Sequence, residues 1–487
     1  MASCTAVIDI GSNSMRLAVI QKTSRFAFHI VHEVKSSVRL PEHAYTNGGY
    51  LQTIAMDRTA DALGEFLQIA RSFKARKILC VATSALRDAP NAHEFIARIQ
   101  REHHLSIKVI DGAKEAYLGG IACANLLAPV NAITVDVGGG SSEFALLNNG
   151  KVEAMHSLNI GTVRLKELFM DHNDIEGAIK YIDDALMSLP FEATQTLIGI
   201  GGTFRALTHS IMKKQEYPLK KLHGFTTSKE EFVSFCTTIM DASPKKLKSL
   251  SIKPDRYDTI KSGALIFLRI LKHLECKELI CSGVGVREGL FLSDLLRNSA
   301  HRFPANYNPS VRYLLDTYDT HSDHGLQCSA LVKRIFDLVH AHLNLDVKWR
   351  STLVMAAKLI PIGLGIRYYA YQKHSHYLAL NTLEYGLTHH QIALISHLML
   401  FKKGYSSSEI IPKNSYESLL PEVKILDTLH SLLWLSHILL AQRSSAQSFD
   451  LSFNEGELSI STPHLYLARE QLKNLVLPKN LNINLLP

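Results

Sequence analysis

The chain has 487 residues, of which 46% are hydrophobic and 20% are charged, with 53 Lys and Arg against 45 Asp and Glu. This composition excludes a disordered chain, a collagen-like sequence and a small disulfide scaffold, and a chain of this length can bury large cores. The net charge of +8 suits a polyanionic partner but does not distinguish nucleic acid, nucleotides, polyphosphate or an anionic membrane.

The first 300 residues alternate short apolar runs with segments of helical periodicity, which predicts an α/β architecture. Strands are predicted at Ala6–Ile10, Met15–Ile20, Phe26–Val38, Lys77–Ala82, Ile107–Ile110 and Ala132–Val137. Helices are predicted at Met56–Ser72, at Asn91–His103, from about Lys114, and at Phe204–Met212.

An internal repeat joins two of these strand–turn–strand units. The segment that begins at Ala6 aligns without a gap with the segment that begins at Ile133, so that Asp9 matches Asp136, Gly11 matches Gly138 and Ser14 matches Ser141. Two such copies favour two related α/β lobes that face a shared cleft. The alternative is a chance likeness between two hairpins.

Beyond about residue 305 the strand signals fade. Helices are predicted at Ser310–Tyr318, Leu326–His342, Trp349–Leu364, Glu384–Phe401 and Ile425–Gln442, and a small α+β tail at 449–487. The prolines of Ser299–Pro309 indicate the domain boundary. The apolar stretch 425–441 contains Asp427, His430 and His437 and is short for a membrane span, so we interpret it as a buried helix.

Seven cysteines without a C-x-x-C pair indicate free thiols in a reducing compartment. No basic segment followed by an apolar one opens the sequence, so no secretory signal is expected. We therefore expect a cytoplasmic protein without a membrane partner.

The two repeated turns, 9–14 and 136–143, favour phosphate binding. Each begins with a carboxylate and continues through small residues whose backbone N–H groups can approach an anion closely. Neither turn matches the Walker A or the dinucleotide-binding pattern. Either turn alone could be an ordinary hairpin, but the pair with equivalent aspartates favours a phosphate site. A third glycine signal, Gly199–Thr203, precedes a helix and suits either a nucleotide contact or a tight strand–helix turn.

The carboxylates indicate the reaction class. Asp9, Asp136 and Glu143 lie on or beside the turns, and Glu115 opens a predicted helix. Phosphoanhydride hydrolysis requires charge neutralisation and a base that orients water. Taken alone, Glu115 is better explained as a helix-capping residue or a solvated surface charge. Arg87 follows a strand end, where it could grip a phosphate or form a surface salt bridge.

Lysine clusters at 213–214, 220–221 and 245–248 could guide a polyanion, but a solvated surface explains them better. They carry no interleaved aromatic residues, so neither DNA nor RNA is expected as a partner.

Six motifs together resemble the exopolyphosphatase/guanosine pentaphosphate phosphohydrolase (Ppx/GppA) family, in order and spacing over residues 5–295. They are Asp9-Ile-Gly-Ser-Asn-Ser14, Ala82-Thr-Ser-Ala-Leu-Arg87, Glu115-Ala116, Asp136-Val-Gly-Gly-Gly-Ser-Ser-Glu143, Gly199-Ile-Gly-Gly-Thr203 and Gly283-Val-Gly-Val-Arg-Glu-Gly289. The resemblance implies a duplicated actin-like core of the sugar kinase, Hsp70 and actin superfamily. It also implies an α-helical HD-like C-terminal extension with a small α+β tail.

The resemblance implies domains at 1–128 (lobe I), 129–303 (lobe II), 304–445 (helical) and 446–487 (tail). It implies catalytic roles for Glu115 and Glu143, and a metal site at Asp9, Asp136 and Glu143. The implied phosphate-binding residues are Ser12, Asn13, Ser14, Arg87, Gly138, Gly139, Gly140, Ser141 and Ser142, and the implied nucleotide-binding residues are Gly201, Gly202 and Thr203.

In the extension, Ile360 and Pro361 replace the His-Glu pair of the long family members, so a metal site there is not expected. The extension is expected to shape the substrate path or a dimer interface. The stretch Lys373–Tyr377 matches the family again.

The resemblance implies an Mg²⁺-dependent (or other divalent cation-dependent) hydrolase acting on acid anhydrides. It would release the terminal phosphate of polyphosphate, or the 5′ γ-phosphate of pppGpp to give ppGpp. Polyphosphate or guanosine pentaphosphate is then the expected partner, and the expected assembly is a homodimer. The alternatives are a non-catalytic (p)ppGpp or polyphosphate sensor and a kinase of the same fold.

Overall fold

The protein is described here by a computed structural model, which covers residues 3–191, 194–319, 322–412, 416–441, 448–463 and 465–486. The chain divides into two compact units, Met1–Tyr307 and Asn308–Pro487. This division falls within the stretch Ser299–Pro309, where the sequence predicts a domain boundary. The finer division into four domains stays a prediction.

The first sheet of the N-terminal unit is five-stranded, in the order β3-β2-β1-β4-β5. Its strands are β1 (Ser3–Ile10), β2 (Met15–Lys22), β3 (Phe28–Ser36), β4 (Lys77–Ala82) and β5 (Lys108–Val109). Strand β1 lies at the centre and is buried along nearly its whole length because both faces of the sheet are covered. The helices of this lobe are α1 (Thr53–Ser72), α2 (Ser84–Arg87), α3 (Ala92–His103) and α4 (Gly112–Leu126).

The second sheet repeats this topology and adds one strand, in the order β10-β11-β9-β6-β7-β8. Its strands are β6 (Ala132–Val137), β7 (Ser142–Asn148), β8 (Lys151–Leu158), β9 (Thr196–Ile200), β10 (Thr226–Ser228) and β11 (Glu278–Cys281). The series β8-β7-β6-β9-β11 corresponds strand for strand to β3-β2-β1-β4-β5. The predicted duplicated actin-like core is therefore confirmed, and the chance likeness of two hairpins is excluded.

Helices cover the second sheet and enclose a core of phenylalanine and aliphatic side chains. They are α5 (Thr162–Leu168), α6 (Ile175–Leu186), α7 (Gly201–Lys214), α8 (Lys229–Met240), α9 (Pro244–Ser249) and α10 (Ile260–His273). The last helix of this unit is α11 (Val286–Leu295). Phe204 of α7 stacks on Phe232 of α8, with ring centroids 4.8 Å apart.

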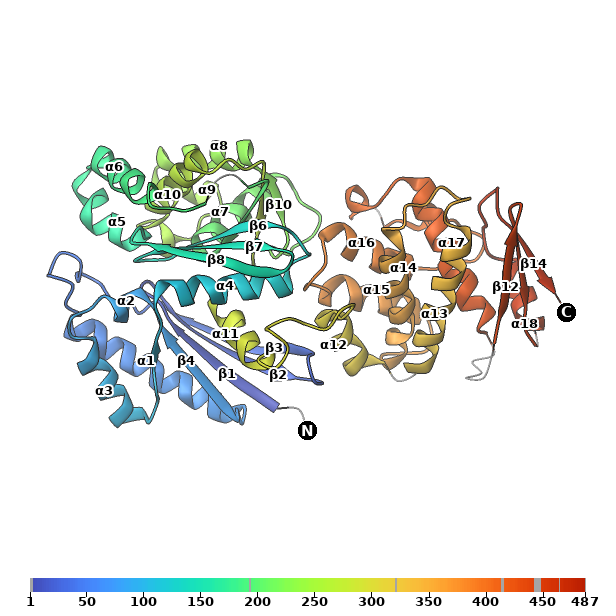
Figure 1. The fold of residues 1–487 in the computed structure, drawn as a ribbon, viewed down its shortest axis with the longest axis horizontal. Helices are drawn as coiled ribbons and strands as arrows, with labels where there is room; N and C mark the ends of the chain where they lie inside the picture. Colours follow the sequence, from blue (N-terminus) through green and yellow to red (C-terminus); the bar gives the residue numbers. More distant parts are fainter. Residues whose placement is uncertain are drawn as a thin grey trace. The chain divides into compact units, whose positions relative to one another are not determined.

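Two helices cross between the lobes (Figure 1). Helix α4 follows the first sheet in sequence but packs on β7 and β8 of the second, while α11 follows the second sheet and packs on β1 of the first. The two helices also pack against each other, and Gly289 of α11 lies so close to the Leu118 carbonyl of α4 that a Cβ would collide with it. The lobes are thereby joined at the base of the cleft.

The C-terminal unit is mostly helical. Its helices are α12 (Pro309–Tyr318), α13 (Ser322–Val339), α14 (Trp349–Leu359), α15 (Tyr371–Thr382), α16 (His389–Leu398), α17 (Val423–Leu439) and α18 (Tyr466–Leu472). A small mixed sheet of β12 (Asp450–Asn454), β13 (Glu457–Ser461) and β14 (Asn482–Leu486) forms the predicted α+β tail. Figure 1 shows these elements in colours that run from yellow through orange to red.

Two predicted helices of this unit are markedly shorter in the structure, and one helix was not predicted. The helix predicted to reach Leu364 ends at Leu359, because Pro361 leads into a 3₁₀ segment at Ile360–Gly365. The helix predicted from Glu384 begins at His389, where Thr388 and Gln391 form a capping box. The sequence analysis did not predict α15, whose buried positions are few.

The stretch 425–441 lies largely in α17, which is buried as predicted. Within the described residues, no helix combines the length and the apolar composition that crossing a membrane requires. All seven cysteines are free and buried.

Candidate active site

Two twin turns lie at the ends of the central hairpins. Asp9 pairs with Arg16 across β1 and β2, and Asp136 pairs with Glu143 across β6 and β7. Each hairpin closes with the same backbone hydrogen bond, from Gly11 N–H to the Ser14 carbonyl at 3.3 Å and from Gly138 N–H to the Ser141 carbonyl at 2.9 Å. The sequence repeat is thus a repeat of backbone geometry.

The two turns touch. A Cβ on Gly139 would lie 2.8 Å from Ser12 Cβ and 3.2 Å from Asn13 N, and one on Gly140 would lie 2.7 Å from Ser84 Oγ. Glycine is therefore required where the second turn meets the first. Ser12 Oγ and Ser84 Oγ share a hydrogen bond of 2.8 Å.

Helix α5 anchors the glycine turn from below. The N–H groups of Thr162 and Val163 donate to the Gly138 and Gly139 carbonyls at 2.9 and 2.8 Å. The guanidinium of Arg164 donates to the Gly140 carbonyl at 2.8 Å. These bonds hold three consecutive glycines in one conformation, which offsets the entropy that glycine loses on folding.

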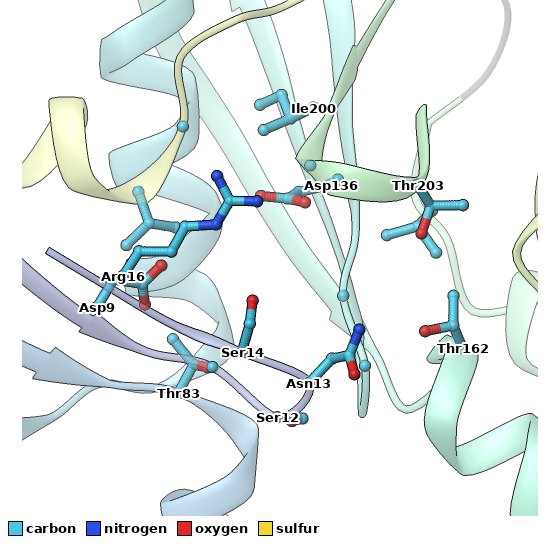
Figure 2. A pocket seen from close by; sticks show the side chains of 18 of the residues that line it. Asp9, Ser12, Asn13, Ser14, Arg16, Thr83, Asp136, Thr162, Ile200 and Thr203 are labelled. Atoms are coloured by element: carbon cyan, nitrogen blue, oxygen red, sulfur yellow. The ribbon is translucent and has the colours of Figure 1, made fainter. Parts of the chain in front are cut away.

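A cavity of about 140 Å³ lies between the turns (Figure 2). Figure 2 shows side chains from both lobes around it, including Asp9, Ser14 and Arg16 from the first and Asp136, Thr162 and Thr203 from the second. Its lining is strongly polar. A space of this size and polarity suits phosphate groups.

Five cationic side chains line this cavity: Arg16, Lys35, Arg205, Arg256 and Arg287. Burial, together with Arg205 and Arg287 nearby, lowers the pKa of Arg16 to about 10. Burial and other cations also lower the pKa values of Lys35 and Arg256. Burying several cations close together is unfavourable unless an anion neutralises them. This cluster therefore indicates a site for an anion that carries several charges.

Four carboxylates oppose these cations. Burial raises the pKa of Asp136 to about 6, and it also raises the pKa of Asp9 against the opposing effect of Arg287 and Arg16. Burial raises the pKa values of Glu115 and Glu143 as well, and each is raised further by neighbouring carboxylates. Perturbed carboxylates gathered in a cleft are typical of an active site.

Glu115 sits in the first turn of α4, whose N-cap Asp111 accepts a hydrogen bond from Lys114 N–H at 2.6 Å. Its Oε2 accepts from Arg87 Nη1 at 3.2 Å. The other guanidinium nitrogen of Arg87 lies 3.4 Å from Ser141 Oγ. Arg87 therefore connects the predicted base to the glycine turn, and the helix-capping explanation of Glu115 is wrong, since Asp111 is the cap.

The predicted nucleotide-binding segment opens α7 with its first residues against the cavity. Gly201 has φ +84°, and a Cβ there would collide with the Asp136 carboxylate. Arg205, one turn further along α7, donates to the Gly201 carbonyl at 3.1 Å and to the Gly283 carbonyl at 2.7 Å.

The structure brings most of the predicted site residues into one cavity. Those that line it are Asp9, Ser12, Asn13, Ser14, Glu115, Asp136, Gly138, Gly139, Ser141, Gly201, Gly202 and Thr203. Four predicted site residues do not line the cavity: Arg87, Gly140, Ser142 and Glu143. Ser142 Oγ donates to the Ile160 carbonyl at 2.5 Å, and Glu143 accepts from Ser157 Oγ at 3.0 Å.

Sequence reasoning missed most of the cations. Arg16 is the repeat partner of Glu143, and Arg287 lies within the motif Gly283–Gly289, so the sequence carried a signal at both positions. Lys35 and Arg205 lie outside the motifs quoted from the sequence. Glu288, a carboxylate that was not among the predicted site residues, also lines the cavity.

Among the described residues, no three His, Cys, Asp or Glu side chains are gathered as they would be around one metal ion. Mg²⁺ retains several waters and needs only one or two carboxylates. The oxygen donors of Asp9 and Asp136 have that chemistry, and burial raises the pKa values of both. The residues present therefore fit a hard divalent cation.

Comparison with known proteins gives consistent matches. A model described as the Ppx/GppA phosphatase family matches residues 18–298, and one described as Ppx/GppA phosphatase, domain III, matches residues 308–480.

Two curated relatives are similar to this chain. A guanosine-5′-triphosphate,3′-diphosphate pyrophosphatase from Pseudoalteromonas translucida is 27% identical over 422 residues, covering 83% of this chain and 82% of the relative. A bifunctional 3-dehydroquinate synthase/phosphatase from Fusobacterium nucleatum is 33% identical over 289 residues, covering 55% of this chain. The chain spans only 43% of that second relative.

Two solved structures share the fold of the N-terminal unit. The Aquifex aeolicus member of the Ppx/GppA protein family is 30% identical, with a TM-score of 0.54, and covers 61% of this chain and 99% of its own. An exopolyphosphatase from Cytophaga hutchinsonii is 25% identical, with a TM-score of 0.53, and covers 60% of this chain and 98% of its own.

Proposed function

The chain belongs to the Ppx/GppA phosphatase family, and from that premise we propose that it hydrolyses the terminal phosphoanhydride bond of polyphosphate or of pppGpp. The observation that carries this proposal is the cavity between the twin turns, which holds cations and perturbed carboxylates together. Cations alone would suit a binding site, whereas buried carboxylates beside them suit the activation of water.

In this proposal the chain holds the phosphate groups from several sides. The turn backbones at Ser12–Ser14 and Gly138–Ser141 approach the terminal phosphate, and the Thr162 and Thr203 side chains line the same space. Arg16, Arg205 and Arg256 neutralise the following phosphates. This arrangement positions the scissile bond and stabilises the charge that spreads over the phosphoryl oxygens in the transition state.

Glu115 is the proposed base. A carboxylate whose pKa is raised is a stronger base when ionised, and Arg87 opposes the raising effect of burial on the pKa of Glu115. Glu115 would accept the proton of the water that attacks the terminal phosphorus, and the bond to the bridging oxygen would break. Glu143 lies behind and is held by Ser157, so it would position Glu115 rather than touch the substrate.

Asp9 and Asp136 would hold a divalent cation, and this cation would neutralise phosphate charge when bound. Glu143, predicted as a third metal ligand, does not line the cavity. The proposal therefore assigns the cation to the two aspartates.

The test compares wild type with Glu115→Gln, using phosphate release from polyphosphate and from pppGpp side by side. We expect Glu115→Gln to bind either substrate but to lose about 10²- to 10⁴-fold in kcat, the usual contribution of a general base. The control is Glu65→Gln, on the exposed face of α1, which should retain activity.

Wild-type turnover by Glu115→Gln would remove Glu115 from the mechanism. Tight binding without phosphate release by the unmodified protein, at any Mg²⁺ concentration, would instead identify a sensor. Transfer of phosphate from ATP to an acceptor would identify a kinase.

A further inference from the structure

We propose that the C-terminal unit contains a separate binding site for a purine nucleotide, in a cavity of about 1070 Å³. Helices α13, α15 and α17 contribute most of its wall, and all its lining residues belong to Asn308–Pro487. The volume is slightly above the range of about 300–1,000 Å³ that is usual for small-molecule sites. The proposal does not depend on the function proposed for the N-terminal unit.

One wall of this cavity is an aromatic platform. Phe401 and Trp434 are stacked, with ring centroids 4.4 Å apart and planes inclined by 28°. Trp434 is fixed in this orientation because its indole N–H donates to the Leu398 carbonyl at 3.0 Å. The His437 ring meets Trp434 edge-on, at 4.9 Å between centroids. Trp434 is 2% exposed and supports Phe401 from behind, so the face that can stack a planar base is that of the half-buried Phe401.

A second wall is polar. Tyr371 Oη lies 2.8 Å from His437 Nε2, and His437 Nδ1 lies 3.1 Å from His324 Nε2. The side-chain amides of Gln372, Gln471 and Asn474 line the same cavity. Amides and imidazoles supply both donors and acceptors, as the edge of a purine requires. An apolar ligand such as a fatty acyl chain would desolvate these groups without replacing their hydrogen bonds.

Two charged side chains that line the cavity, Lys403 and Asp323, are exposed, and they carry opposite charges. Lys403 lines the cavity and is exposed, so its ammonium can meet a phosphate group. The adjacent Lys402 does not line the cavity, because its ammonium lies 3.4 Å from the centre of the Tyr405 ring. The two lysines thus form a matched pair, one facing the cavity and one turned aside.

Tryptophan fluorescence provides a local test. The chain has two tryptophans, so Trp349→Phe leaves Trp434 in the cavity wall as the single reporter. AMP and GMP are suitable probes because neither contains a phosphoanhydride bond to hydrolyse. We expect saturable quenching by AMP or GMP at micromolar to low millimolar concentrations, and no quenching by tripolyphosphate.

Two variants in that background locate the site. Lys403→Gln should weaken binding about fivefold, the effect of losing one exposed ion pair, while Lys402→Gln should leave the affinity unchanged. Ala441→Phe, which fills the cavity from the end of α17, should abolish quenching. A thermal unfolding profile verifies that each variant is folded. If Ala441→Phe does not fold, the comparison of Lys403→Gln with Lys402→Gln still tests whether the nucleotide binds in this cavity.

The proposal is overturned if neither nucleotide quenches Trp434 at 5 mM, about the weak limit expected of such a site. It is also overturned if tripolyphosphate quenches as strongly as the nucleotides do, or if Lys402→Gln and Lys403→Gln behave alike.

Discussion

Arg87 illustrates how single side chains tune this site. Arg87 is the last residue of α2, the short helix that follows β4. Its guanidinium donates hydrogen bonds to Glu115, Ser141 and the Ile110 carbonyl. Its side chain is 20% exposed, and that of Glu115 is 11% exposed, so water screens their attraction only in part. The sequence predicts a phosphate contact or a surface salt bridge at Arg87. The structure shows an ion pair with the proposed base Glu115, and the phosphate contact stays a prediction.

Arg87→Gln should change the pH dependence of the reaction. Arg87 lowers the pKa of Glu115 against the raising effect of burial, so its removal raises that pKa further. A base must be unprotonated, and the acid limb of the profile of kcat/KM against pH should therefore shift to higher pH, with at least a tenfold loss at pH 7. Arg98→Gln, on the surface of α3, serves as the control. An unshifted acid limb would show that Arg87 does not act through Glu115.

At the scale of elements, the position of Glu115 depends on the contact between α4 and α11. Gly289 places the α11 backbone directly on the Leu118 carbonyl of α4. Gly120 of α4 faces Val152 of β8, where a Cβ would lie 2.8 Å from the valine Cγ2. Small residues on both sides let α4 lie deep between the lobes, and Glu115 is thereby brought to the cavity.

Gly289→Ala should separate these helices. The added methyl group collides with backbone, which cannot rotate away, so we expect a loss of about 1–3 kcal/mol in the free energy of unfolding and a fall in activity. Gly64→Ala in α1 is the matched control, since its Cβ would meet only the end of the His103 side chain at 3.1 Å. Urea denaturation and phosphate release measure both effects. Equal behaviour of the two variants would contradict the tight contact.

At the scale of the whole molecule, the two units bury different kinds of titratable group. The N-terminal unit buries carboxylates and arginines around a cavity. The C-terminal unit buries histidines in its helical core. His397 Nε2 lies 3.1 Å from the Ser407 carbonyl, and His430 Nε2 lies 2.8 Å from the Leu400 carbonyl. Burial lowers the pKa of each of these histidines to about 4.

Acid should therefore destabilise the C-terminal unit. In the unfolded chain these two histidines bind a proton near pH 6.5, whereas in the folded chain they stay neutral down to about pH 4. The stability is complete above pH 6.5 and is lost as the pH falls through this window, by about 2 kcal/mol per histidine at pH 5. Both tryptophans lie in this unit, so urea denaturation followed by their fluorescence reports on it. The double variant His397→Gln/His430→Gln should be less stable at pH 7 but should lose less stability on acidification. An undiminished loss would exclude these two histidines as the cause.

The sequence by itself determined the duplicated core and the two turns, because these depend on local signals. Apolar strands, small residues and carboxylates recur in the same order in both copies, and Asp9, Ser14, Asp136 and Ser141 could be identified without coordinates. Helix α15 escaped because its sequence lacks a strong apolar periodicity, so its helical form depends on tertiary packing.

Only the tertiary structure decided which charged residues share the cavity and which stand behind it. Arg16, Arg205 and Arg256 are far apart in the chain and meet because two sheets pack through α4 and α11. The aromatic cavity of the C-terminal unit likewise joins residues from α13, α15 and α17. Periodicity and turn chemistry act over a few residues, whereas the convergence of distant side chains depends on how whole elements pack.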